Sequence, residues 1–248
     1  MVLPYDPMDP IGFDPHLRAR LAANLDNHET TSHELDGRRH AAVGIVVIDS
    51  DAELHGDDPT ELDRVSLIGE IPGADTAGLT GRVDGTAGGA AIILTRRGSR
   101  LSTHSNQWAL PGGRIDDGET PLQAAMREIS EEVGLELGEE HLLGRLDDYP
   151  TRSGYVMSPF VFWAPDDAEP EANPDEVASI HRIAITELMQ DPRFVSIPES
   201  DRPVIQVPIG GDLIHAPTGA IIHQFRAVAY DGQPVRVDQY EQPVFAWK

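Results

Sequence analysis

The sequence of 248 residues contains no cysteine, and this absence removes several kinds of chemistry. Without cysteine there is no disulfide framework, no thiolate metal site and no cysteine nucleophile. Lysine is nearly missing as well, because Lys248 is the single lysine and arginine supplies the other basic side chains. Long apolar runs are also missing, since the longest, at 41–48, is far too short to cross a bilayer.

Basic residues are few, and 42 acidic against 19 basic side chains give a formal charge of −23. We do not expect such a chain to coat nucleic acid or an anionic membrane, because binding polyphosphate needs local positive charge. A phosphorylated substrate would need a divalent cation or a local arginine cluster. The first residues carry proline and aspartate rather than a basic and then an apolar stretch, so we expect no secretory signal and a cytoplasmic location.

The pattern of apolar residues predicts a mixed α/β protein. A helix is expected from Asp14 and Pro15, with Leu17, Leu21 and Leu25 on its buried face. Strands are expected at 41–49, 90–95, about 142–149, 155–163 and 177–185, with a short helix at 186–190. The acidic, glycine-rich stretch 50–89 is expected to be an insertion with a strand at 65–71. For the apolar runs at 203–209, 213–215 and 219–229, the sequence leaves open whether they form helices or strands.

One helix is bounded on both sides by local signals. Thr120, Pro121 and Gln123 form a capping box with proline at the first helical position, and Gly134 is placed to end the helix. We therefore predict a helix over 121–133.

Three carboxylates share one side of this predicted helix. With Glu128 at 0°, Glu131 falls at about 300° and Glu132 at about 40°, while the apolar residues lie opposite. Like charges at this spacing repel, and glutamate is unfavourable near a helix C-terminus. Two interpretations are open: a solvated acidic face, or a site for a hard divalent cation, which binds clustered carboxylate oxygens.

The segment from 113 to 135 resembles the Nudix box at every defining position. The matching residues are Gly113, Glu119, Arg127, Glu128, Ile129, Ser130, Glu131, Glu132, Val133, Gly134 and Leu135. The resemblance implies an enzyme that hydrolyses a nucleoside diphosphate linked to another group, with an α/β/α sandwich fold and a mixed sheet. We accordingly expect an N-terminal arm and helix at 1–38, a Nudix hydrolase domain at 39–192 and a C-terminal extension at 193–248.

The resemblance also implies roles for individual residues. Glu128 and Glu132 would be principal ligands of Mg²⁺ or Mn²⁺, with Glu131 as a third ligand or a base. The carbonyl of Gly112 would join the coordination. Glu119 and Arg127 would pair and fix the loop against the helix. The metal would polarise the diphosphate for in-line attack on phosphorus.

The general base is not part of the box in every member of the family. Asp175 and Glu176, which follow an acidic loop at 165–175, are candidates for it. The alternative is that both side chains belong to a solvated loop.

The stretch 93–113 resembles the segment that marks coenzyme A pyrophosphatases within the family. Leu94, Thr95, Arg97, Leu101, His104 and the run 111–113 have compatible spacing, whereas Gly98, Asn106, Trp108 and Leu110 depart from the pattern. The run 153–159 also resembles that subfamily. The implied reaction cleaves coenzyme A or acyl-CoA to 3′,5′-ADP and the corresponding 4′-phosphopantetheine.

Arg96, Arg97 and Arg100 form a basic cluster in this acidic chain and, with His104, are candidate substrate-binding residues. The alternatives are that the arginines only balance acidic charge, and that His104 forms a hydrogen bond within a loop. Trp108 fits the core better than a base-stacking position, and His181 is expected on a strand surface.

Two other functions stay open. Pro150 lies fifteen residues after Leu135, as in Nudix ADP-ribose pyrophosphatases, so ADP-ribose or another nucleotide sugar is an alternative substrate. A non-catalytic Nudix-fold ligand sensor is the alternative of another class, although such proteins usually lose box carboxylates. The expected partner is a small nucleotide, with no nucleic acid and no membrane, and the C-terminal extension could pack on the domain or form a homodimer contact.

Overall fold

The structure is a computed structural model that describes residues 9–50, 88–97, 108–209 and 212–247. The expected strand at 65–71 and nearly all of the expected insertion at 50–89 lie outside the described residues. Arg100 and His104 also lie outside them, and only the backbone of Arg97 is described.

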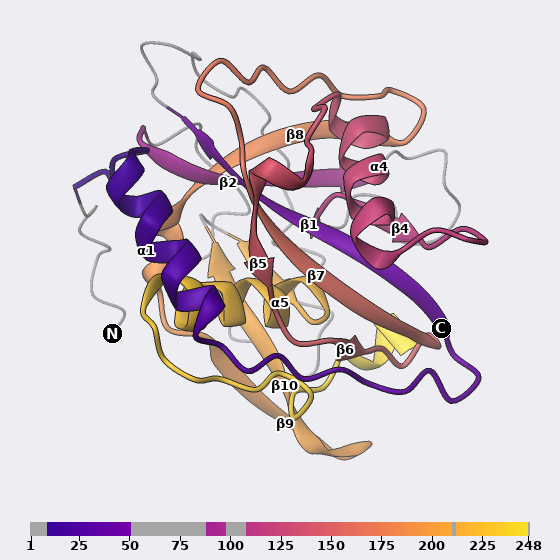
Figure 1. Cartoon of the computed structure of the whole chain (residues 1–248). Helices are drawn as coiled ribbons and strands as arrows, with labels where there is room; N and C mark the ends of the chain where they lie inside the picture. The colour runs from indigo at the N-terminus through magenta and orange to yellow at the C-terminus, as the bar shows by residue number, and fades with distance from the viewer. Residues whose placement is uncertain (1–8, 51–87, 98–107, 210–211, 248) are drawn as a thin grey trace.

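Eight strands of the described chain form one mixed sheet at the centre of the molecule (Figure 1). The hydrogen-bonded path runs β3-β2-β1-β7-β5, with β4 on β1, β6 on β7 and β8 on β2. β1 is parallel to β7 and antiparallel to β2 and β4. The bounds are β1 (Arg39–Asp49), β2 (Ala90–Arg97), β3 (Trp108–Ala109), β4 (Gly112–Arg114), β5 (Leu142–Arg145), β6 (Tyr149–Pro150), β7 (Tyr155–Trp163) and β8 (Val177–Ala184).

Helices cover both faces of this sheet, which confirms the expected layered α/β architecture. Helix α4 (Pro121–Val133) packs on one face, where the buried cluster includes Val46, Ile93 and Phe162. Helices α1 (Pro15–Asp26) and α5 (Thr218–Gln224) share the cluster on the other face, together with the π-helical turn η3 (Phe225–Tyr230). Figure 1 shows these layers, with α4 on the side away from α1 and α5.

The C-terminal part adds a three-stranded antiparallel sheet in the order β11-β10-β9. Ile205, Val207 and Ile214 of this sheet belong to the same buried cluster as α1 and α5, so the C-terminal segment packs on the large sheet. Short 3₁₀ helices complete the described chain. The remaining bounds are β9 (Arg193–Ile197), β10 (Ser200–Ile209), β11 (Asp212–His215), η1 (Glu139–His141), η2 (Ile185–Met189) and η4 (Val244–Trp247).

The expected first helix is confirmed together with its cap. Asp14 is extended, its side chain accepts a hydrogen bond from the Leu17 N–H at 2.8 Å, and Pro15 is the first helical residue. Leu17, Leu21 and Leu25 are buried as predicted. None of the helices in the described ranges is long and apolar enough to span a membrane.

The expected strand at 142–149 was wrong in its extent, because the chain leaves the sheet between β5 and β6. Asp147 and Asp148 lie in this break, and both are buried. Their carboxylates accept hydrogen bonds from the Thr31 and His33 N–H groups, at 2.7 and 3.0 Å. At these two residues, hydrogen bonds with the N-terminal arm therefore replace the pairing of a continuous strand.

Candidate active site on helix α4

Helix α4 has the bounds and the caps that its sequence predicts. The Thr120 hydroxyl accepts a hydrogen bond from the Gln123 N–H, while the Gln123 side chain accepts one from the Thr120 N–H. Gly134 is left-handed, with φ 70°, and its N–H donates to the Ser130 carbonyl at 3.0 Å. These local bonds satisfy backbone groups that a helix leaves open at its ends, so they fix where the helix starts and stops.

The apolar side of α4 sets the height of the helix above the sheet. Ala125, Ile129 and Val133 are fully buried against the sheet. Gly44 of β1 lies directly under Ile129, because a Cβ atom at position 44 would stand 2.5 Å from Ile129 Cδ1. Because glycine has no side chain, position 44 lets the helix approach the sheet closely. This approach also fixes how far the glutamates of α4 lie from the sheet.

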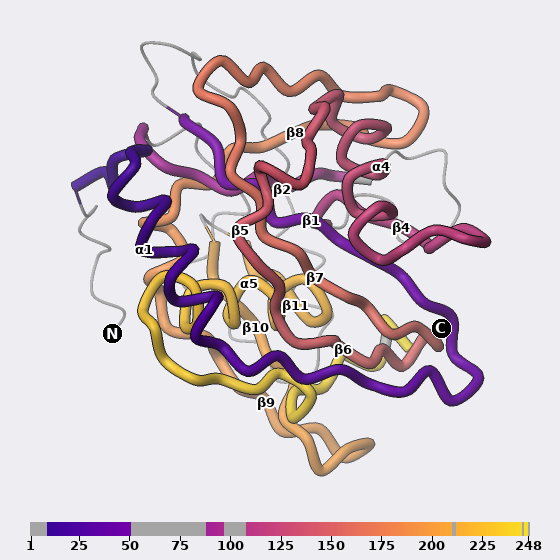
Figure 2. The backbone as a smooth tube through the Cα atoms, viewed as in Figure 1, coloured from indigo at the N-terminus to yellow at the C-terminus, as the bar shows by residue number. Residues whose placement is uncertain are grey.

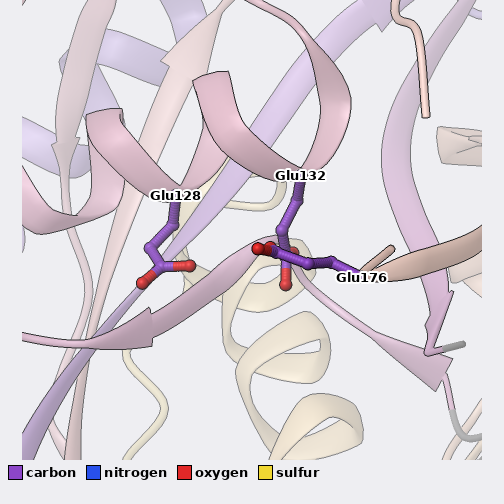
Figure 3. Close-up of side chains that lie close together, drawn as sticks. All are labelled: Glu128, Glu132 and Glu176. Carbon is purple, nitrogen blue, oxygen red and sulfur yellow. The ribbon is translucent and has the colours of Figure 1, made fainter. Parts of the chain in front are cut away.

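Glu128, Glu132 and Glu176 bring their carboxylates together beside α4 (Figure 3). One oxygen from each lies within 4.8 Å of the others. Glu128 and Glu132 come from successive turns of α4, and Glu176 comes from the residue just before β8. Glu132 is buried, at 6 % exposed, whereas Glu128 and Glu176 are half-buried. Three converging carboxylates in this geometry suit a hard divalent cation.

Strand β4, which precedes α4, carries two glycines beside these carboxylates. The Gly112 N–H donates a hydrogen bond to Glu132 Oε2 at 3.2 Å. A Cβ atom at position 113 would stand 2.5 Å from Glu128 Cδ, and one at position 112 would stand 2.6 Å from Val43 Cγ1. Position 112 therefore requires glycine, because a side chain would displace the neighbouring strand, whereas a side chain at position 113 would displace the Glu128 carboxylate. The predicted metal contact of the Gly112 carbonyl stays a prediction.

Arg127 joins the loop to the helix through three carboxylates. Its Nε and Nη2 atoms donate to the two oxygens of Glu119, at 2.9 and 3.1 Å. Its Nη1 atom donates to Glu128 and to Glu131, both at 2.9 Å, and Nη2 also reaches the Arg114 carbonyl at 3.0 Å. The hydrogen bond from Arg127 lowers the pKa of Glu119, and the same pairing raises the pKa of Arg127. The expected Glu119–Arg127 pair is thus present.

Glu131 does not lie with the other two box glutamates. Its side chain is 48 % exposed and forms an i, i+4 ion pair with Arg127. On a helix, Glu131 and Glu132 fall on opposite sides of Glu128, and Arg127 lies on the side of Glu131. The position that sequence reasoning gave to Glu131 is taken by Glu176, and the roles of both residues stay predictions.

Burial changes the chemistry of the acidic face. Desolvation raises the pKa of Glu128, and the charges of Glu131 and Glu176 act in the same direction, while the hydrogen bond from Arg127 opposes them. The interpretation as a solvated acidic face fits Glu131, but it does not fit Glu132 or Glu128, whose carboxylates turn into the molecule. Charge held in a partly buried cluster is costly without a compensating cation.

Arg96, a candidate substrate-binding residue, is 2 % exposed on the face of the sheet opposite α4. Its Nη2 atom lies 3.6 Å from Asp212 Oδ2, and its guanidinium carbon lies 3.7 Å above the Trp108 ring. The Trp108 indole donates to the same Asp212 oxygen at 2.8 Å. This burial supports the alternative in which Arg96 balances acidic charge, although substrate binding by Arg96 stays a prediction.

His181 packs edge-on against Trp108, with ring centroids 4.8 Å apart, and it is buried. The expectation that His181 lies on a strand surface was therefore wrong. Trp108, on which His181 packs, is itself held by hydrogen bonds with Asp212 and Thr218 of the C-terminal segment. The expected core position of Trp108 is confirmed, since this residue is 7 % exposed.

The sequence indicates Glu176 only as one of two candidate bases and does not place this residue with the box glutamates. Asp175 is exposed, whereas Glu176 belongs to the cluster. The one available signal was the position of Glu176 directly before a predicted strand. The many acidic residues of the preceding loop hide that signal.

Comparison with known proteins gives a consistent result. The family model described as the NUDIX domain matches residues 79–204, which is half of the chain. A protein of Yersinia enterocolitica named "Uncharacterized Nudix hydrolase NudL" is 35 % identical over 104 residues, covering 42 % of this chain and 53 % of that protein. A protein of the same name from Yersinia pestis is 35 % identical over 107 residues, covering 43 % and 54 %. The chain thus spans about half the length of these curated relatives.

Among solved structures, a MutT/nudix family protein from Enterococcus faecalis matches with a TM-score of 0.47 and 15 % identity, covering 83 % of this chain and 66 % of that one. The capped helix, its converging carboxylates and the extent of the family match lead to one conclusion. The chain belongs to the NUDIX domain family.

Proposed function

We propose that this protein is a divalent-metal-dependent pyrophosphohydrolase that cleaves a nucleoside diphosphate linked to another group. The observation that carries the proposal is the convergence of Glu128, Glu132 and Glu176 within 4.8 Å (Figure 3). The three carboxylates supply oxygen ligands and excess negative charge, the combination that Mg²⁺ and Mn²⁺ prefer. Such an ion, when bound, neutralises diphosphate charge and polarises the phosphorus toward attack by water.

The residues of this chain have separate tasks in the proposal. Glu132 and Glu128 hold the ion, and Glu176 is either a third ligand or the group that accepts a proton from the attacking water. Arg127 binds Glu119 and the carbonyl of Arg114, and it thereby keeps β4, with Gly112 and Gly113, in place beside the carboxylates. Glu131, which faces solvent and Arg127, is available as a ligand only after its side chain turns.

For the substrate we propose coenzyme A or an acyl derivative, cleaved to 3′,5′-ADP and the 4′-phosphopantetheine. The support is the resemblance of the stretch 93–113 to coenzyme A pyrophosphatases. Arg97, Arg100 and His104 of this stretch are the candidates for binding the phosphates of the substrate. The placement of Pro150 favours ADP-ribose as the second candidate. The domain limits at 39–192, the cytoplasmic location and a homodimer stay predictions.

A substrate panel tests the activity. Pure protein is incubated with Mn²⁺ or Mg²⁺ and coenzyme A, ADP-ribose, NADH or diadenosine polyphosphates, and the products are separated chromatographically. We expect fastest release of 3′,5′-ADP from coenzyme A. Preference for ADP-ribose would overturn the proposed substrate and leave the reaction class intact. Tight binding of one of these metabolites with no hydrolysis of any of them would favour the alternative function of a non-catalytic ligand sensor.

Matched glutamine variants test the carboxylate cluster. Glu132→Gln and Glu176→Gln keep side-chain shape and remove charge at the cluster, so both should lose Mn²⁺ affinity, and Glu132→Gln should lose turnover. Glu131→Gln, on the same helix but outside the cluster, tests the alternative ligand and should retain Mn²⁺ binding if Glu176 takes that place. Near-normal turnover in Glu132→Gln would contradict its role as a ligand.

A further inference from the structure

The segment 171–176 is bonded to the C-terminal end of α4. The Glu171 N–H donates to the Val133 carbonyl at 2.9 Å, and the Asn173 N–H donates to the Glu132 carbonyl at 3.2 Å. A helix leaves its last carbonyls without partners inside the helix, so this segment caps α4 from outside. Figure 2 shows the chain between β7 and β8, in orange, passing beside α4.

The same segment ends in a turn that is organised around Asn173. The Asn173 carbonyl accepts hydrogen bonds from the Glu176 N–H at 3.1 Å and the Val177 N–H at 2.8 Å. The Asn173 side-chain oxygen accepts a third bond, from the Asp175 N–H at 3.2 Å. Pro174 occupies the next position and restricts the backbone further.

Asn173 therefore connects two members of the carboxylate cluster through its own backbone. Its N–H is bonded to the carbonyl of Glu132, and its carbonyl is bonded to the N–H of Glu176. The connection matters because three carboxylates this close repel one another. Glu176 comes from a loop, so without a constraint this repulsion would turn it toward solvent.

We propose that Asn173 is a positioning residue that holds Glu176 beside Glu128 and Glu132, so that the cation site is assembled before the cation binds. This proposal rests on the proposed function, because it takes the cluster to be the cation site. Asn173 itself touches neither ion nor substrate. Its side chain keeps the turn 173–176 closed, and its backbone ties that turn to α4.

The test uses Mn²⁺ alone as the probe, measured on the full chain from the loss of the free-ion electron spin resonance signal. Asn173→Ala removes the side-chain acceptor of the turn and should weaken Mn²⁺ binding about tenfold, as expected for residues that orient metal ligands. Asn173→Asp keeps an acceptor oxygen at the same place and should restore binding. Glu171→Ala is the control, because it removes a loop charge while its capping bond uses only the backbone.

Pro174→Gly provides a second variant that keeps every hydrogen-bonding group and only loosens the turn. It should also weaken Mn²⁺ binding and lower the thermal midpoint of the metal-free protein by about 2–4 °C, because glycine adds conformational entropy to the unfolded chain. Equal Mn²⁺ affinity in the wild type, Asn173→Ala and Pro174→Gly would overturn the positioning role alone. Failure of the wild type to bind Mn²⁺ would overturn the proposed function, and this inference with it.

Discussion

Gly113 lies so close to Glu128 that a Cβ atom at position 113 would stand 2.5 Å from Glu128 Cδ. Gly113→Ala should push this carboxylate out of the cluster and weaken Mn²⁺ binding by about tenfold. The thermal midpoint should change little, because Gly113 is not left-handed and alanine fits its backbone. Titration with Mn²⁺ and a melting curve on the same sample check this prediction, which fails if Mn²⁺ affinity is unchanged.

Arg127→Lys should loosen the loop over the site. Lysine carries one ammonium group and cannot reproduce the fork that bonds Glu119 twice and also reaches Glu128 and Glu131. We expect turnover to fall and the free energy of unfolding to drop by only about 1 kcal/mol, because these pairs are partly exposed. Arg114→Lys is the control, since only the carbonyl of Arg114 takes part in this network. Equal turnover in the two variants would contradict the prediction.

Asp212→Ala should destabilise the protein strongly. It removes one ionic partner of buried Arg96 and the acceptor of the Trp108 indole N–H. Removing one member of a buried ion pair costs about 3–5 kcal/mol, because the other charge stays in a poorly solvating environment. Chemical denaturation measures the loss, and Asp201→Ala provides an exposed aspartate as the control. A loss below about 1 kcal/mol would contradict a structural role for the Arg96–Asp212 pair.

Glu241 should make stability depend on acid pH. Burial by itself raises the pKa of Glu241, but hydrogen bonds from Arg152, Ser200 and Arg202, and from the Gln242 backbone, bring this pKa to about 2, below the ordinary 4.5. Because the folded-state pKa is lowered, the stabilisation is fully present above pH 4.5 and is lost as pH falls through about 2.

Glu241→Gln removes this contribution, so it should lower the free energy of unfolding at pH 7 and flatten its decline between pH 4.5 and 2. Denaturation curves at several pH values provide the measurement. Glu199→Gln, at an exposed glutamate, should leave the pH profile as it is. Parallel pH profiles for the wild type and Glu241→Gln would show that Glu241 is not the titrating group.

Local sequence signals predict helix α4 from its first to its last residue. Thr120, Gln123 and Gly134 act on backbone groups only three or four positions away, so the signals and the structure they produce lie in the same short stretch. The same holds for the cap at Asp14. The pair of Glu119 and Arg127 was instead implied by the resemblance to the Nudix box, and it is present in the structure.

Which carboxylates meet depends on contacts between segments that lie far apart in the chain. Helical geometry makes both Glu131 and Glu132 neighbours of Glu128, on opposite sides, and the choice between them depends on what packs on each side. Glu176 reaches the cluster because the segment 171–176 bonds to the end of α4, and Arg96 is buried because the C-terminal segment brings Asp212 to it. These contacts join residues far apart in the chain, and no local periodicity carries that information.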